Sequence, residues 1–149
     1  MSVRIWTAMA VAAGLIAATG AFAQEEPQVV RQELMKRQGE AMGVLGRTAK
    51  GEIEFDSAAV ITALETIQEV AVEFPDYFPE GSETGFETEA LPAIWEDKAD
   101  FDAKSAALAE DAAAAIEAAP ADVAELQPIM QELGQSCSGC HESYRQSDS

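Results

Sequence analysis

Two cysteines and the only histidine of the chain stand together near the C-terminus, in the order Cys137-Ser138-Gly139-Cys140-His141. Two thiols three residues apart on a helix can reach the two vinyl-derived carbons at one edge of a porphyrin, and the next residue is then positioned over the iron as a ligand. This Cys-x-x-Cys-His spacing is the attachment signature of c-type haem. It predicts haem c, bound covalently through Cys137 and Cys140, with His141 as an iron ligand.

Three other kinds of site could use the same residues. A thioredoxin-like redox pair needs its Cys-x-x-Cys at the start of a helix that follows a strand, whereas this motif ends the last predicted helix. A zinc site needs a fourth ligand, and the chain has no further Cys or His. A disulfide between Cys137 and Cys140 would constrain only four residues and would leave His141 without a role. These comparisons favour haem.

The segment that carries the motif has helical periodicity. Apolar side chains recur at i, i+3, i+4 and i+7 from Leu126 to Tyr144, and the motif continues the same stripe. The pattern predicts a helix over residues 122–144. Pro128 is discordant, and it either kinks the first turns or marks a later helix start.

Three more helices are predicted upstream. Helical spacing and the positions of Gly and Pro give a helix over 28–50 that ends at Gly51, one that begins at Asp56 or Ser57 and ends before Pro75, and an alanine-rich one over 94–118. A long loop rich in Pro, Gly and acidic residues covers 75–92. Four helices with mostly short connections predict an all-α fold, an antiparallel four-helix bundle with the covalently bound haem near its C-terminus.

The first 23 residues have the organisation of a secretory signal peptide. Arg4 is the only charge before Glu25, an apolar stretch follows it, and Ala21-Phe22-Ala23 supplies the small-x-small cleavage pattern. We therefore expect residues 1–23 to be removed and residues 24–149 to form one exported domain, located in a periplasm. The alternative is an uncleaved anchor, since an uncharged segment of this length could just span a bilayer. No second apolar run of that length follows.

The composition excludes several classes of function. The chain has 149 residues, with nine basic against 27 acidic side chains and a formal net charge of −18. We therefore expect no nucleic-acid binding, which needs clustered Lys and Arg. The sequence has no evident nucleophile–base pair, so we expect no enzyme. The acidic surface either serves solubility or steers the protein to a basic partner.

Through these features the sequence resembles the class II c-type cytochromes, the group of cytochromes c′ and c556. In that family the haem motif lies near the C-terminus, as it does here. The resemblance covers nearly all of residues 24–149, and the segments that carry it are Arg31-Gln32-Glu33-Leu34-Met35, Phe78-Pro79-Glu80-Gly81-Ser82, Leu91-Pro92-Ala93-Ile94-Trp95 and Tyr144-Arg145. It implies that residues 24–149 are a four-helix-bundle cytochrome domain.

The resemblance also implies roles for residues outside the motif. The positions that it matches are Arg31 and Gln32 near the haem propionates, Phe78, Thr88 and Glu89 along the haem edge, and Arg145 on the proximal side of the haem. It further implies thioether attachment at Cys137 and Cys140, with His141 as the fifth iron ligand. For Arg31 and Gln32 the alternative is an ordinary solvated helix face.

Met35, four residues after Arg31, matches the position that faces the distal side of the iron. If its sulfur binds the iron, the haem is six-coordinate and low-spin, as in c556. If Met35 only packs over the porphyrin, the iron is five-coordinate and high-spin, and an apolar pocket favours NO or CO. The run from Met35 to Gly39 favours ligation, because it is more similar to the low-spin members. Met42 is a weaker candidate ligand, and a core position without haem contact is the third interpretation of Met35.

The sequence thus predicts a periplasmic haem protein that carries single electrons between redox partner proteins. The alternatives are a protein that binds NO or CO and a redox or metal-storage module without haem. After signal cleavage we expect no membrane span. Family members are often dimers through the first two helices. The sequence shows no unambiguous extra apolar stripe on these helices, so it does not decide between a monomer and a homodimer.

Overall fold

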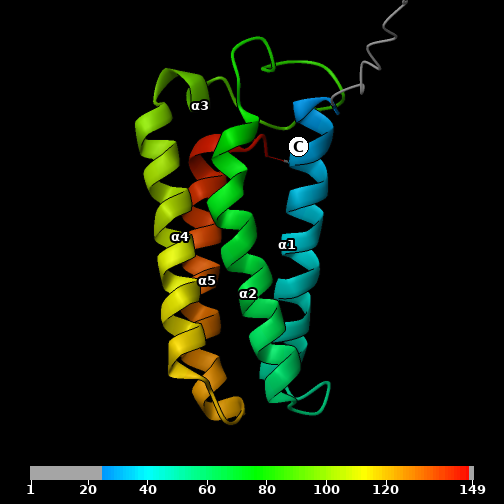
Figure 1. Ribbon diagram of the computed structural model, residues 1–149, viewed down its shortest axis with the longest axis vertical. Coiled ribbons are helices and arrows are strands. Elements are labelled where there is room, and N and C mark those ends of the chain that lie inside the picture. Colours follow the sequence, from blue (N-terminus) through cyan, green and yellow to red (C-terminus); the bar gives the residue numbers. More distant parts are fainter. Residues whose placement is uncertain (1–24, 148–149) are drawn as a thin grey trace, which may run out of the picture.

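Four long helices make up most of the described chain (Figure 1). The computed structural model describes residues 25–147. The elements in order are α1 (Pro27–Ala49), α2 (Ser57–Glu73), the short 3-10 helix η1 (Phe74–Tyr77), the single turn α3 (Ala93–Glu96), α4 (Lys98–Ala118) and α5 (Val123–Tyr144). Successive long helices run in opposite directions, which confirms the antiparallel four-helix bundle. The predicted signal peptide, residues 1–23, lies outside the described residues.

Local capping explains where the helices begin and end. The carboxylate of Asp56 accepts hydrogen bonds from the backbone N–H of Ala58 and of Ala59, so α2 begins where the sequence predicted. After α1, Gly51 adopts φ +71° and Glu52 donates its N–H to the carbonyl of Arg47 at 2.9 Å. This is a Schellman end, which a glycine favours because it has no Cβ.

The structure corrects two details of the predicted helices. Residues 94–118 are not one helix: the chain breaks at Asp97, whose side chain accepts the N–H of Asp100 and caps α4. A short acidic side chain competes with the helical backbone for its own N–H groups, which explains the break. In the last helix, Pro128 lies inside α5 and the helix already begins at Val123, so the later start is wrong.

The interior changes in character along the bundle. A core of small and branched residues joins all four long helices: Ala41, Leu45, Val60, Ala63, Leu64, Ile67, Ala112, Ala115, Leu126 and Leu133. A second cluster, made of Phe78, Ile94, Phe101 and Tyr144, lies at the end where α5 terminates. The buried face of α1 includes Gln38, Arg31 and Gln28 together with Leu34 toward that same end, whereas Leu45 and Ala41 pack in the main core. The half of the bundle that carries the Cys-x-x-Cys-His motif is therefore the more polar and aromatic one.

The long loop between α2 and α4 closes this end of the bundle (Figure 1). Its residue Ala90 forms an isolated antiparallel bridge with Arg145. The N–H of Leu91 donates to the carbonyl of Tyr144 at 3.0 Å, and the N–H of Gln146 donates to the carbonyl of Glu89 at 2.8 Å. The loop is thus fixed by main-chain hydrogen bonds to the residues that directly follow the motif.

Within residues 25–147, no helix combines the length and the apolar character needed to cross a membrane.

Candidate functional site

The motif occupies the last turns of α5. Cys137 and Cys140 are half-buried thiols that are not joined in a disulfide, and His141 is exposed. Burial raises the pKa of both thiols, and the charge of Lys104 partly opposes this at Cys140. Both cysteines therefore stay uncharged at neutral pH. Since α5 is continuous here, the spacing of three residues presents both thiols on one side of the helix.

The surroundings of His141 favour its neutral form, chiefly through burial. Partial burial, reinforced by the positive charge of Arg145, lowers the pKa of His141, while Glu89 acts in the opposite direction. At neutral pH the imidazole is therefore uncharged and has a nitrogen lone pair to offer a metal. In the described part of the chain, no three side chains of His, Cys, Asp or Glu gather into a metal-binding group. These residues thus give no support to the zinc interpretation.

Contacts between α1 and α5 define the register of the two helices. The Nε2 of Gln127 donates to the carbonyl of Ala49 at 3.2 Å. One turn further along each helix, the terminal carbon of Met130 lies 3.8 Å from the point where a Cβ on Gly46 would stand. The helices are antiparallel and have the same rise per residue, so a step toward the N-terminus of α1 matches an equal step toward the C-terminus of α5.

Extended along the bundle, this register brings Met35 level with His141. Met35 stands eleven residues before Gly46, and His141 stands eleven residues after Met130. Met35 is half-buried and faces neither fully outward nor fully into the core. The candidate distal residue and the candidate iron ligand thus occupy the same height on neighbouring helices.

The loop provides an independent check of this register at the other end. Thr88 accepts a hydrogen bond from Arg31, which lies four residues before Met35. Two residues further on, Ala90 pairs with Arg145, which lies four residues after His141. A short stretch of one loop therefore contacts both helices at the level that the register predicts.

Arg31 is the centre of the hydrogen bonds that hold this loop. It is 4 % exposed, and its terminal nitrogens donate to the carbonyl of Tyr77 at 3.2 Å, the hydroxyl of Ser82 at 3.1 Å, the carbonyl of Ser82 at 2.8 Å and the hydroxyl of Thr88 at 3.3 Å. Burial lowers the pKa of Arg31, and the nearby charge of Glu83 raises it. The solvated-face interpretation of Arg31 is wrong, because the side chain is an interior cross-link.

Phe78 lies directly under this guanidinium. The carbon at the centre of the guanidinium of Arg31 is 4.5 Å from the centre of the Phe78 ring and 5.6 Å from that of Trp95. The Phe78 ring also packs edge-on against Phe101, with centroids 4.7 Å apart. Cys140 packs against the same aromatic cluster. The Arg31 cross-link and the second cysteine of the motif are therefore connected through one aromatic cluster.

The other predicted site residues lie on the surface of the same end. The Nε2 of Gln32 donates to the carbonyl of Phe86 at 2.7 Å, and its side chain is exposed. The Nε of Arg145 donates to a carboxylate oxygen of Glu89, also at 2.7 Å. Gln32, Glu89 and Arg145 thus connect α1, the loop and the C-terminal segment.

Sequence reasoning missed three participants. Ser82 supplies two of the acceptors of Arg31, and Gln28 donates to the carbonyl of Thr84 at 2.8 Å. The hydroxyl of Tyr144 donates to a carboxylate oxygen of Asp100 at 2.6 Å, which ties α5 to α4. Gln28 had a detectable signal, because it stands three and four residues before the two polar positions already selected on α1.

The buried polar atoms of this end fit haem c. Three buried side-chain atoms of the described residues have no hydrogen-bond partner: the Nε of Arg31 and the Oε1 atoms of Gln28 and Gln38. An orphaned cationic N–H suits a carboxylate such as a propionate, and the aromatic cluster beside Cys140 suits an apolar ring. Two uncharged thiols, a neutral imidazole and a thioether complete a donor set of the kind that holds haem.

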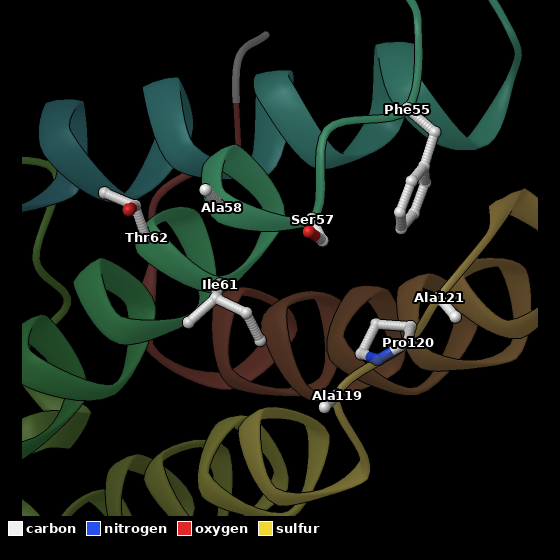
Figure 2. Close-up of a pocket in the computed structure, with 8 residues that line it drawn as sticks. All are labelled: Phe55, Ser57, Ala58, Ile61, Thr62, Ala119, Pro120 and Ala121. Carbon is white, nitrogen blue, oxygen red and sulfur yellow. The ribbon is translucent and has the colours of Figure 1, made fainter.

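An open pocket lies at the opposite end of the bundle (Figure 2). It has a volume of about 740 Å³ and is lined by Phe55 just before α2, by residues of the first turns of α2 such as Ile61, and by Pro120 between α4 and α5. None of its lining residues is a predicted site residue, so it is separate from the motif.

Comparisons with known proteins agree with this arrangement. The sequence profile of a family described as "Cytochrome C'" matches residues 26–145. The chain is 45 % identical over 132 residues to cytochrome c-556 of Agrobacterium fabrum, covering 89 % of this chain and 88 % of that one.

Two solved structures are also similar to the chain. Cytochrome c′ of Rhodopseudomonas palustris has a TM-score of 0.81 and 37 % identity, covering 85 % of this chain and 100 % of the other. The structure of oxidised cytochrome c556 of R. palustris has a TM-score of 0.76 and 35 % identity, covering 85 % and 100 %. The family match over residues 26–145 includes the bundle, the loop and the motif.

Proposed function

The chain belongs to the cytochrome c′ family, and from this membership we propose that it is a periplasmic one-electron carrier with a low-spin, c556-like haem c. Proteins of this family carry covalently bound haem c, so the chain is a haem protein of the electron-carrying or gas-binding kind. When bound, haem c supplies the one-electron couple between Fe(II) and Fe(III). The proposal includes no substrate turnover, since the only histidine is assigned to iron.

Four residues hold the haem in this proposal. Cys137 and Cys140 supply the two thioether links, His141 supplies the proximal nitrogen, and Met35 supplies the distal sulfur. The observation that carries the proposal is the register of α1 and α5, since it gives Met35 and His141 the same height on neighbouring helices. An axial Met raises the reduction potential of a haem, which suits an electron carrier.

The same register argues against Met42 as the distal ligand. Met42 is seven residues further along α1, about 10 Å along the helix axis at 1.5 Å per residue. It also packs against the main core around Leu45, in the half of the bundle away from the motif. We therefore assign Met42 to the core.

The remaining predicted residues position the haem environment. Arg31 keeps Nε as a buried donor for a propionate, while its terminal nitrogens hold the loop that carries Phe78 and Thr88. Gln32, Glu89 and Arg145 tie that loop to α1 and to the segment after His141. Their shared role in the proposal is to exclude water from the haem edge.

Export to the periplasm is part of the proposal. The signal-peptide pattern of residues 1–23 supports it, as does the start of the family match at residue 26, just after the predicted cleavage site. N-terminal sequencing of the secreted protein tests this: a mature chain that begins at Gln24 is expected, and a retained leader would contradict it.

A second function, gas binding by a five-coordinate haem, is favoured by one observation. Of the two solved R. palustris structures compared above, the cytochrome c′ gives the higher TM-score. The visible absorption spectrum of the protein, matured by a c-type assembly system, separates the two. Split α and β bands after reduction, with the weak near-infrared band of Met–iron ligation after oxidation, are expected. A broad, unsplit reduced band with a high-spin oxidised spectrum would replace the electron carrier by the gas binder. A protein without any Soret band would refute both.

A further inference from the structure

We propose that Phe86 and the four glutamates of its loop form the docking surface for a redox partner whose contact face has an apolar patch ringed by Lys and Arg. The surface consists of Phe86 with Glu80, Glu83, Glu87 and Glu89, and we call it the acidic loop face. This inference rests on the proposed electron-carrying function and names the chemistry of the partner.

Phe86 is the apolar centre of this face. Among the described residues, only Phe86 and Val72 are large hydrophobic side chains with high exposure, at 53 % and 66 %. A single exposed hydrophobic side chain is ordinary in a monomer, but an aromatic ring surrounded by charged residues is typical of the centre of a protein interface. Phe86 therefore indicates a surface that another protein covers.

The backbone that presents Phe86 is unusual. Gly85, Phe86 and Glu87 have φ values of +91°, +51° and +54°, a left-handed conformation that costs energy for residues with a side chain. Two side chains of α1 hold it in position: Gln32 donates to the carbonyl of Phe86, and Gln28 donates to the carbonyl of Thr84. The exposed ring is thus presented by a fixed turn.

The charges of the loop select a basic partner. From residue 78 to residue 92 the loop has four glutamates and no Lys, Arg or His. The two arginines that bond to it from other elements are already engaged, since Arg31 is buried beneath the loop and Arg145 pairs with Glu89. A second copy of this chain would bring the same acidic residues and be repelled, whereas a basic surface would be attracted.

The face is also connected to both helices that carry the proposed iron ligands. Gln32, which bonds the carbonyl of Phe86, stands one helical turn before Met35. Glu89 bonds Arg145, one turn after His141. A partner seated on Phe86 therefore contacts the end of the bundle at which the cofactor is attached, as short-range electron transfer needs.

Two charge-reversal variants test the electrostatic part. Glu87→Lys changes the acidic loop face. Glu54→Lys makes the same change in net charge at the opposite end of the bundle and serves as the control, because the Glu54 and Glu87 side chains are both exposed. The probe is a basic c-type cytochrome with lysines around its haem edge, in its iron form. By stopped flow at low salt, we expect Glu87→Lys to slow electron transfer at least about threefold and Glu54→Lys to change it much less. Equal effects of the two variants would overturn the proposed face.

Two further variants test the apolar centre. Phe86→Ser removes the ring, and Val72→Ser removes the other exposed hydrophobic side chain. We expect Phe86→Ser to slow electron transfer at high salt as well as at low salt, because apolar burial is not screened. Val72→Ser should leave the rate of electron transfer unchanged. Phe86→Leu, which keeps a large apolar side chain, should retain most of the wild-type rate. A rate for Phe86→Ser equal to that of Val72→Ser would contradict the inference.

A binding measurement separates this inference from the proposed function. The same probe with zinc in place of iron is titrated into the labelled, reduced protein, and backbone amide shifts are followed by NMR. Shifts centred on residues 80–89 are expected, with residues 50–58 at the far end unaffected. Shifts centred elsewhere, with electron transfer intact, would overturn the face and keep the function. Binding at the face without electron transfer would keep the face and overturn the function.

Discussion

The guanidinium of Arg31 stacks 4.5 Å over the ring of Phe78 and, through its terminal nitrogens, also holds Ser82, which is 51 residues away in the sequence. One buried cation is therefore shared between the aromatic cluster and the backbone of the loop. If the loop left α1, the Phe78 ring would be exposed and the Arg31 guanidinium would lose its hydrogen-bond acceptors. This end of the bundle therefore behaves as one unit.

Replacing Arg31 tests that unit. In Arg31→Lys we expect the free energy of unfolding to fall by about 2 kcal/mol, because lysine keeps the charge but lacks the planar fork that reaches four acceptors. Urea unfolding followed by far-UV circular dichroism measures it. The control is Arg47→Lys, an exposed arginine with one bond to a carbonyl, which should cost less than about 0.5 kcal/mol. Equal losses would show that the fork does not hold the loop.

Met35 and Met42 form a matched pair for the distal ligand. In Met35→Ala we expect the reduced spectrum to become broad and unsplit, because the proposed sulfur ligand is lost. Met42→Ala should keep the low-spin spectrum and instead lower the free energy of unfolding by about 2 kcal/mol, since Met42 packs against the core. If Met42→Ala alters the spin state and Met35→Ala does not, the ligand assignment is reversed.

Tyr144 should make the stability depend on alkaline pH. Its hydrogen bond to Asp100 raises the pKa of the phenol to about 12, above the value of 10.0 for an unperturbed tyrosine. A pKa raised in the folded state contributes stability that is present below pH 10 and lost as the pH rises toward 12. The wild-type protein should therefore lose stability more steeply than Tyr144→Phe between about pH 10 and 12. If the free energy of unfolding falls by the same amount in both proteins between about pH 10 and 12, the expectation is refuted.

Asp97 should be required for the start of α4. Its carboxylate accepts the N–H of Asp100 at 3.1 Å. In Asp97→Ala we expect the free energy of unfolding to fall by about 1 kcal/mol, the usual value of an N-cap. Asp97→Asn keeps an acceptor oxygen and should cost only a few tenths of that, as measured by thermal denaturation. A loss in Asp97→Asn as large as in Asp97→Ala would point to the charge and not to the cap.

Local signals explain how much of the fold was predictable. The start of α2 at Asp56 and the left-handed Gly51 after α1 depend on nearest neighbours, and both agree with the sequence. The break at Asp97 also depends on a capping side chain, but the helix-favouring alanines downstream hide it. Helical periodicity by itself therefore finds the segments and misses the point where one of them is interrupted.

The candidate site was predictable as a set of residues and not as a set of contacts. Cysteine spacing identified Cys137, Cys140 and His141, because the chemistry depends on that spacing alone. The contact of Arg31 with Ser82 joins distant parts of the chain, and nothing in the local pattern selects a serine in a loop. The common height of Met35 and His141 likewise depends on the packing of α1 against α5, which periodicity does not define.

The pairing of residues 89–91 with residues 144–146 also sets an order of events during synthesis. A ribosome makes the chain from its N-terminus, so these loop residues are made about 55 residues before their partners. Until the final residues emerge, these backbone groups have only water to bond. The motif lies only a few residues before these partners, so the end of the bundle that carries the two thiols is also the last end to close.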